Sequence, residues 1–365
     1  GNQDGNDIGD FYYTPPTGFL ALCTSNLPAV AVIPSKHFNT VLYTGNAPTG
    51  QSITGVGFAP DLSWFKSRTI TSHHNLVDSV RGDNLRFRSN TNDDELTATV
   101  TLDSDGFTLG SQTESNDGNM VAWNWKANGS GSSNTNGSIN TTATSANVDA
   151  GFSISTYTGT GSNATIGHGL SKAPEMVICK RRNASEGWAT YHSGIASDAE
   201  TDFLELHSTG AASDSNTRWN DTAPTSSVFS IGTHDSVNAS SSTYIAYAFH
   251  SVDGYSKVGS YTGNGNADGT FVYTGFRPKF IIRKTTTRTG GGSWMMQDTK
   301  ISTFNVMDDA LKADDSAAEG TATAEYSVDF LSNGFKSRNT WAGLNGTETY
   351  IYIAFAETPF KYSNA

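Results

Sequence analysis

The feature that most constrains this chain is an internal repeat. A Tyr-Thr-Gly sequence occurs three times, and its tyrosines lie 114 and 104 residues apart (Tyr43, Tyr157, Tyr261). In each copy a second block follows, in which a proline opens an apolar run that ends in a lysine (Pro60 to Lys66, Pro174 to Lys180, Pro278 to Lys284). Near the end of each copy come two further strand-like runs. Blocks that recur in one order predict a tandem array of three modules.

The blocks have the character of β-strands. Proline is tolerated at the first residue of a strand, and the run Phe280-Ile281-Ile282 that follows one of these prolines is typical of a central strand. Asp105-Gly106 and Asn333-Gly334 favour tight hairpin turns. Helix signals are nearly absent, and residues 308–319 are the one short candidate. We therefore predict an all-β chain of three tandem antiparallel β-sandwich repeats, of the jelly-roll or lectin-like type.

Composition suggests where the modules meet. Residues 128–147 consist of Gly, Ser, Thr, Asn and Ala apart from Ile139, which is typical of a flexible tether. Modules two and three are joined almost directly through residues 251–255, so we expect these two to form a more rigid pair on an otherwise bead-like string. The predicted division is an N-terminal arm or tail of an upstream domain (1–36), a first sandwich (37–127), a Gly/Ser/Thr/Asn linker (128–150), a second sandwich (151–252) and a third sandwich (253–365).

Composition and charge also limit the classes of function. Ser and Thr supply 89 of the 365 residues, whereas charged residues make up 16%, a balance typical of extracellular or virion β-proteins. The net charge of −12 argues against nucleic-acid binding, and the longest apolar run (28–34) is too short to cross a bilayer. Cys23 and Cys179 predict no disulfide framework. Because the chain starts with Gly1 and a loop-like segment, we expect a processed product or fragment whose natural N-terminus lies upstream.

Several strings in the first module resemble a known family. They are YYTPPTGFLALCTSNLP (12–28), HFNTVLYTGN (37–46), GVGFAPDLSWFKSR (55–68), HNLVDSVRG (74–82), SDGFTLG (104–110) and VAWNWK (121–126). Together they resemble a repeat module of marine bacteriophage and cyanophage virion proteins, of the kind found in tail fibres or other appendages, commonly after a concanavalin-like or SPRY-like β-sandwich. The resemblance is dense over residues 12–128 and looser beyond, where copy two lacks the Asp-Gly turn and has Leu170 in place of Phe. It implies a virion location and a β-sandwich fold, and it carries no catalytic residue to this chain.

The sequence holds no motif that predicts catalysis, a cofactor or a metal site. The eight histidines are scattered, and the chain lacks Gly-x-Ser-x-Gly, HExxH, CxxC and EF-hand patterns. The acidic clusters at 93–95 and 308–315 have no counterpart in the other copies, so we interpret them as solvated loops. We therefore predict no catalytic, cofactor-binding or metal-binding residues.

Two tryptophans are the candidates for ligand contact. Trp219 and Trp341 lie in polar, loop-like sequences and could stack on sugars; core packing or a contact between protomers is the alternative. Trp123 aligns with Tyr247 and Phe355, which predicts a core position. We interpret the lysine shared by the three copies as a strand-edge charge that discourages edge-to-edge aggregation (Lys66, Lys180, Lys284).

Together with the repeats and the composition, the resemblance implies a non-enzymatic structural and adhesion protein of the virion, part of a phage tail fibre or similar appendage. Its expected partners are other virion proteins, further copies of itself in a homo-oligomer such as a trimer, and host-surface glycans, without nucleic acid or membrane insertion. The alternatives are a capsid decoration protein or a lectin-like extracellular surface protein, for which the apolar arm at 11–34 would serve docking. A glycan-degrading enzyme is a third alternative, but no motif supports it.

Overall fold

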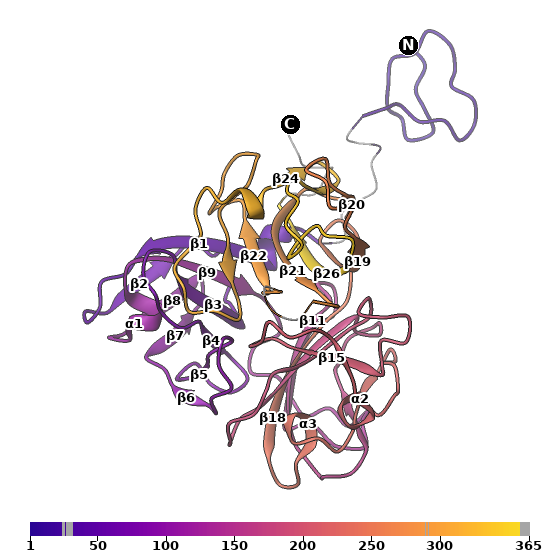
Figure 1. The fold of residues 1–365 in the computed structure, drawn as a ribbon. Helices are drawn as coiled ribbons and strands as arrows, with labels where there is room; N and C mark the ends of the chain where they lie inside the picture. Colours follow the sequence, from indigo (N-terminus) through magenta and orange to yellow (C-terminus); the bar gives the residue numbers. More distant parts are fainter. Residues whose placement is uncertain (24–25, 27–31, 289, 291, 358–365) are drawn as a thin grey trace.

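A computed structural model of the chain describes residues 1–23, 26, 32–288, 290 and 292–357 (Figure 1). The fold is nearly all β, with 38% of residues in strands and 5% in helices. The strands pair antiparallel in sheets that fall into three groups along the chain. The prediction of an all-β chain with antiparallel sheets is confirmed. Within the described ranges, no helix is long and apolar enough to span a membrane.

The first lobe comprises residues 38–125. Its main sheet has the order β1-β9-β3-β4-β5-β6, and a smaller sheet, β2-β8-β7, covers one face of it. The elements are β1 (Phe38–Thr44), β2 (Gln51–Thr54), β3 (Leu62–Ser67), β4 (Asn75–Asp78), β5 (Leu85–Phe87), β6 (Leu96–Thr97), β7 (Val100–Asp103), β8 (Gly106–Leu109), α1 (Thr113–Asn116) and β9 (Asn119–Trp125), preceded by the short turn η2 (Pro34–Lys36).

The second lobe comprises residues 143–249. Its main sheet has the order β10-β11-β18-β13-β14-β15-β16, and its smaller sheet is β12-β17. The elements are β10 (Ala143–Asn147), β11 (Phe152–Thr158), β12 (Ala164–Gly167), β13 (Met176–Arg181), β14 (Ala189–His192), β15 (Asp202–Glu205), β16 (Ser213–Asp214), α2 (Asn216–Trp219), β17 (Val228–Ile231), α3 (Asp235–Asn238) and β18 (Thr243–Phe249).

The third lobe comprises residues 256–356. Its main sheet has the order β19-β26-β21-β22-β23, and its smaller sheet is β20-β25-β24. The elements are β19 (Ser256–Thr262), β20 (Phe271–Tyr273), β21 (Pro278–Thr285), β22 (Met295–Asp298), β23 (Leu311–Lys312), η3 (Ala324–Tyr326), β24 (Val328–Leu331), β25 (Gly334–Ser337) and β26 (Thr349–Ala356). The helix predicted at 308–319 is wrong, because Leu311 is buried in a strand that pairs with Met296 of β22.

The Tyr-Thr-Gly sequence closes each lobe. Each tyrosine hydroxyl donates to a carbonyl in the turn before the lobe's last strand, and the next residue of that turn is a fully buried asparagine (Tyr43 to Ser115 before Asn116, Tyr157 to Val237 before Asn238, Tyr261 to Leu344 before Asn345). The glycine is required because a Cβ at Gly45, Gly159 or Gly263 would lie 2.3, 2.4 or 2.0 Å from the turn's backbone. These asparagines lie outside the blocks that the sequence comparison recognised.

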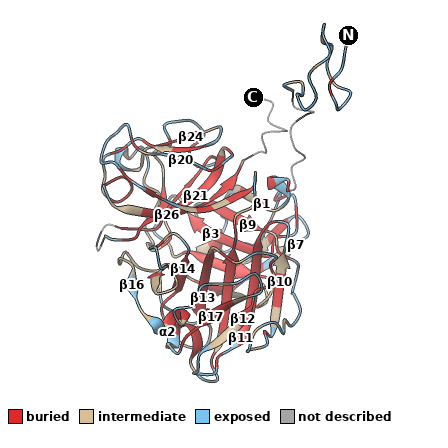
Figure 2. Cartoon of the chain, turned by 90° about the vertical axis from the view of Figure 1, so that its right-hand side faces the viewer, coloured by how far each residue is buried: buried red, intermediate tan, exposed pale blue. Residues whose placement is uncertain are grey.

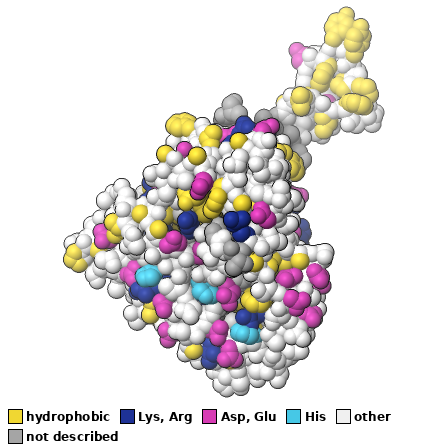
Figure 3. Space-filling view, in the orientation of Figure 1, with side chains coloured by type: hydrophobic (Ala, Val, Ile, Leu, Met, Phe, Trp, Pro, Cys, Tyr) yellow, Lys and Arg dark blue, Asp and Glu magenta, His cyan; other side chains and the backbone are white. Residues whose placement is uncertain are grey.

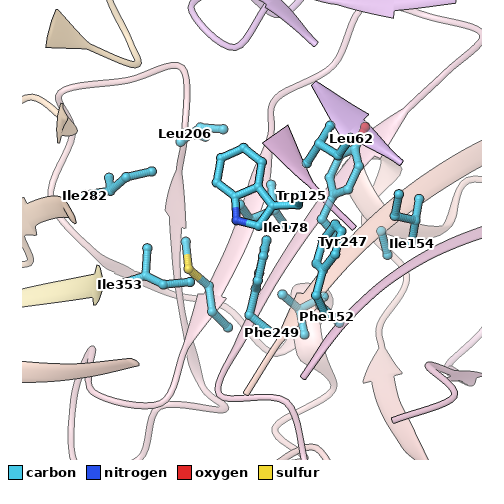
Figure 4. Packing of buried hydrophobic residues seen from close by; sticks show 14 of the residues in the cluster. Leu62, Trp125, Phe152, Ile154, Ile178, Leu206, Tyr247, Phe249, Ile282 and Ile353 are labelled. Carbon is cyan, nitrogen blue, oxygen red and sulfur yellow. The ribbon is translucent and has the colours of Figure 1, made fainter. Parts of the chain in front are cut away.

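The inner faces of the three main sheets meet in one core (Figures 2 and 4). The ring of Phe355 lies 4.9 Å from Phe38 of the first lobe and 6.2 Å from Phe249 of the second, measured between ring centroids. A cavity of about 30 Å³ at this junction has an entirely apolar lining drawn from all three lobes. The predicted bead-like arrangement is therefore wrong, since the lobes share buried surface instead of folding around separate cores.

Contacts at the junctions follow a cycle. The residue just before β4, β14 or β22 has a ring nitrogen that reaches the carbonyl of an equivalent residue in the preceding lobe, with the third lobe taken to precede the first. His74 Nε2 contacts Lys312 O at 2.9 Å, Trp188 Nε1 donates to Arg88 O at 3.2 Å, and Trp294 Nε1 donates to Glu205 O at 3.0 Å. The first lobe thus contacts the third, the third contacts the second, and the second contacts the first.

The three shared lysines lie at these junctions. Each is fully buried on an interior strand, so their interpretation as strand-edge charges is wrong (Lys66, Lys180, Lys284). Lys180 Nζ donates to Asn92 O of the first lobe at 3.2 Å, and Lys284 Nζ donates to Gly210 O of the second lobe at 2.8 Å. Burial lowers the pKa of each lysine to about 8.

The predicted flexible tether at 128–150 is a folded segment. Residues 143–147 form β10, which pairs with β11, and Thr141 and Ser145 are buried. Ile139 forms an isolated parallel bridge with Ile166 of β12, and its backbone N–H donates to Thr165 O at 3.1 Å. The prediction is wrong because small hydroxyl and amide side chains satisfy backbone groups here, which composition alone cannot distinguish from solvent exposure.

The N-terminal arm, residues 1–23, stands apart from the lobes in Figure 1. Its loop is held by Asp4, whose carboxylate accepts hydrogen bonds from the backbone N–H groups of Asn6, Ile8 and Ala21. Five large apolar side chains of the arm are exposed (Tyr12, Tyr13, Phe19, Leu20, Leu22). Residues 24–25 and 27–31 of the predicted arm lie outside the described residues.

Candidate functional site

The outer face of the third lobe's smaller sheet exposes aromatic side chains. Alternate residues of a strand point to the same face, and Phe271 and Tyr273 of β20 flank the buried Val272. Phe271 is 44% exposed and Tyr273 is 65% exposed. Phe271 pairs directly with Lys336 of β25, so that the lysine shares this face. An aromatic and cationic surface therefore covers the sheet from outside.

Ion pairs hold the polar side chains of this face in place. Lys336 Nζ lies 2.6 Å from Asp268 Oδ1, and Arg338 donates from Nε to Asp329 at 2.5 Å and from Nη1 to Asp268 at 3.2 Å. The contact with Lys336, followed by that with Arg338, lowers the pKa of Asp268, and Asp329 raises the pKa of Arg338. The resulting network presents fixed hydrogen-bonding groups beside apolar rings.

Trp341 lies at the end of this surface, in the turn before β26. Its ring packs at 5.8 Å from Tyr326 and is neither fully buried nor fully exposed. Its backbone N–H donates to Asn339 Oδ1 at 3.1 Å, which fixes the turn. A surface depression runs past the ring and is lined by Ala267, Ala324, Glu325, Arg338, Asn339, Thr340 and Ala342. Trp341 is thus the one of the two predicted tryptophans that borders a surface hollow.

Trp219 cannot act as a stacking platform in this structure. Its side chain is 2% exposed, because α2 turns it inward against Tyr191 at 6.0 Å. The polar neighbours Asn220 and Asp221 that suggested a loop occupy left-handed backbone positions just after the helix. The structure therefore does not bring Trp219 and Trp341 together. Trp219 packs in the core, which was the alternative to a sugar-stacking role.

The equivalent surfaces of the other lobes differ in chemistry. Strand pairing aligns Phe271 and Tyr273 with Ser52 and Thr54 of β2, both small hydroxyl residues. In the second lobe the aligned residues are Thr165 and Gly167 of β12, which lie against residues 134–139. The exposed aromatic pair is thus a property of the third lobe.

Tryptophans elsewhere occupy positions of the shared core. The register pairs Trp64 with Trp123, Ile178 with Tyr247 and Ile282 with Ile353. Trp123 therefore corresponds to Ile353, and the earlier alignment with Phe355 was displaced by two residues. Since a shift of two keeps the same sheet face, the prediction of a core position is confirmed.

One carboxylate of each acidic cluster makes a structural contact, Glu95 at a junction between lobes and Asp314 within the third lobe, so for these two the interpretation as solvated loops is wrong, whereas Asp94 is exposed. Glu95 accepts two hydrogen bonds from Arg182, each at 2.9 Å, and Asp314 accepts from the backbone N–H of Trp294 at 2.7 Å. Among the described residues, no group of three or more His, Cys, Asp or Glu side chains is placed to hold a metal ion. Sequence reasoning missed these roles because the partners lie far apart in the chain.

Four of the eight histidines are buried (His74, His168, His192, His250). Burial lowers the pKa of His74 to about 3 and that of His192 to about 4. Neutral His74 accepts from Trp64 Nε1 through Nδ1 at 2.8 Å, which leaves Nε2–H to donate to Lys312 O. His192 Nε2 lies 3.1 Å from Tyr352 O of the third lobe.

A family model, described as a domain of unknown function (DUF7483), matches residues 33–359. The chain belongs to the DUF7483 family. The match spans all three lobes of this DUF7483 protein as one unit and leaves out residues 1–32. No curated protein and no solved structure matches the chain. The family description assigns no function, so function must be argued from the surface chemistry of the lobes.

Proposed function

We propose that this DUF7483 chain is a non-enzymatic structural and adhesion protein of a virion, part of a phage tail fibre or similar appendage, that contacts host-surface glycans through the Trp341 depression. In this proposal the chain comprises three tandem β-sandwich modules that close around one core. The observation that carries the proposal is the half-buried Trp341 ring beside a surface hollow with Arg338, Glu325 and Thr340. Aromatic faces stack on the C–H faces of sugars, while adjacent polar groups bind hydroxyls.

The packing of the lobes supports a mechanical role. Burial shared by three main sheets gives one rigid body, and a rigid body holds a weak binding surface in a fixed orientation. If several copies are displayed on one particle, many weak contacts add by avidity. A polar, weakly charged exterior fits such exposure (Figure 3).

A glycan array followed by titration tests the contact. We expect the full chain to bind a restricted set of oligosaccharides, Trp341→Ala to lose the binding, and Trp341→Phe to retain part of it. The matched control is Ser52→Ala on the equivalent surface of the first lobe, which should leave binding unchanged. If no glycan binds, or if Trp341→Ala binds as well as the native chain, the carbohydrate role is wrong.

A capsid decoration protein is the second candidate, and the exposed apolar arm favours it. An arm of this kind could attach the lobes to another virion surface. Cross-linking mass spectrometry of intact particles distinguishes the two roles. Cross-links from the lobes to tail proteins support the appendage, whereas cross-links from the arm to the major capsid protein support decoration.

A further inference from the structure

Among the described residues, no segment pairs with the outer edge of β20, whereas the equivalent edge in the second lobe is covered. Thr270 O accepts from Ser337 N, and Thr274 N donates to Asn333 O, so alternation directs the backbone groups of Phe271 and Tyr273 away from β25. In the second lobe the residue aligned with Phe271 is Thr165, whose carbonyl accepts from Ile139 N at 3.1 Å. The second lobe thus provides an internal template for covering this edge.

The third lobe has no preceding segment that could cover β20 in the same way. Ile139 precedes the first residue of β11, Phe152, by 13 positions, and the residues between them form a folded cover. Only six residues separate the end of β18 at Phe249 from the start of β19 at Ser256. The segment that precedes β19 therefore does not supply a cover for β20, since it follows directly on the second lobe's main sheet.

We propose that the N-terminal arm of a second copy of this chain packs on the outer face and open edge of β20. The arm carries exposed Tyr12, Phe19 and Leu22, whose exposed fractions are 87%, 69% and 103%. Figure 3 shows apolar side chains gathered on the arm, which stands away from the lobes of its own chain. The described residues of one chain therefore leave both apolar surfaces uncovered, as expected for surfaces that meet between copies.

Charge and backbone chemistry suit this occupant. Residues 1–23 contain three aspartates and no lysine or arginine, whereas Lys336 and Arg338 flank Phe271 on the receiving face. On that face Asp268 and Asp329 balance the two cations, so the face carries no net negative charge that would repel the acidic arm. Open N–H and C=O groups of Phe271 and Tyr273 additionally permit pairing with an extended segment, as in strand addition. This inference is independent of whether Trp341 binds glycans.

Two variants remove one surface each without disturbing the lobes. Phe271→Ser with Tyr273→Thr places the side chains of the equivalent first-lobe strand on β20, so the fold is expected to tolerate both changes. Tyr12→Ser with Phe19→Ser and Leu22→Ser alters only exposed side chains of the arm. The matched control is Ser52→Ala with Thr54→Ala on the first lobe.

Sedimentation velocity and light scattering of the full chain give the decisive readout. We expect the native chain and the control to have at least twice the 38.8 kDa monomer mass, and each variant alone to be monomeric. Mixing the two variants should restore a 1:1 complex, because one supplies an intact arm and the other an intact β20 face. A monomeric native chain, an oligomer that persists in either variant, or a mixture that stays monomeric would each overturn the proposal.

Discussion

The three junctions between lobes share one backbone contact but differ in the side chains that reinforce it. Glu319 N donates to Arg68 O, Glu95 N to Arg182 O, and Ala212 N to Thr286 O, at 2.8, 2.8 and 2.7 Å. At the first two junctions the same residues also form two-point Arg–Glu ion pairs. At the junction of the second and third lobes, Thr286 and Ala212 leave the backbone bond without a charged pair.

Chain connectivity accounts for this difference. The second and third lobes are joined by six residues, so the chain itself keeps their facing surfaces close. A longer segment joins the first and second lobes. The first and third lobes are connected only through the whole of the second lobe. Bringing two lobes together costs more conformational entropy when the chain that connects them is longer. An additional ion pair is therefore most useful at the junctions with the longest connections. The Arg–Glu ion pairs, called clasps below, thus occur at the two junctions where the chain connection constrains the lobes least.

The largest expected effect tests whether the junctions form one cooperative unit. Phe355→Ala should lower the free energy of unfolding by about 3–5 kcal/mol, because the ring is buried against residues of all three lobes. Hydrogen exchange should accelerate in strands of every lobe. The control Phe107→Ala, whose ring contacts Tyr43 and Phe65 of the first lobe, should accelerate exchange mainly there. Faster exchange confined to the third lobe in Phe355→Ala would contradict the shared core.

The buried lysines make the junctions sensitive to pH. Burial lowers the folded-state pKa of Lys180 from 10.5 to about 8, so between these values the unfolded state binds more protons and stability rises with pH. The nearby carboxylates of Glu186, Asp94 and Asp93 oppose the shift without cancelling it. Relative to native protein, Lys180→Met should be more stable at pH 7 than at pH 10, by up to about 3 kcal/mol.

Chemical denaturation of both proteins at pH 7, 8, 9 and 10 measures that change. Taking the difference removes the opposing contributions of tyrosines and Cys179, which titrate alike in the two proteins. Lys172→Met, which removes an exposed lysine from the same lobe, is the matched control. A constant difference for Lys180→Met would mean that its pKa is not lowered by burial.

Removing a clasp should have a smaller effect. Arg182→Ala leaves the carboxylate of Glu95 half-satisfied and should lower the free energy of unfolding by about 1–3 kcal/mol. A double-mutant cycle with Glu95→Gln isolates the pair energy. Thr286→Ala at the unclasped junction is the comparison and should change stability by less than about 1 kcal/mol. If Arg182→Ala and Thr286→Ala lowered the free energy of unfolding equally, the proposed relation between chain connectivity and ion pairing would be wrong.

The smallest expected effect is a gain. Thr286→Arg with Ala212→Glu should transfer the clasp to the third junction and stabilise the protein by less than about 1 kcal/mol, because the lobes there are already held together. Thermal unfolding of the double variant against each single variant measures the gain. A gain equal to the loss in Arg182→Ala would show that all three junctions depend on side chains alike.

Local structure was the part of this fold that the sequence could predict. The Pro-to-Lys block foretold β3, β13 and β21, and Asp105-Gly106 foretold the hairpin between β7 and β8, since turns and strand alternation depend on neighbouring residues. The candidate Trp341 was placed on a surface hollow, whereas Trp219 was not. Both tryptophans lie in polar sequence, and only packing determined which ring α2 turned inward.

The sequence by itself determined that this chain forms antiparallel sheets, where their hairpins turn, and which positions recur. Tertiary structure alone decided that both faces of each main sheet are buried, that Lys66 and its counterparts lie inside, and that Arg68 meets a glutamate 251 residues away. The physical reason is that strand formation depends on the alternation of apolar and polar residues close together in the chain. Burial of the second face of a sheet depends instead on which distant part of the chain packs against it.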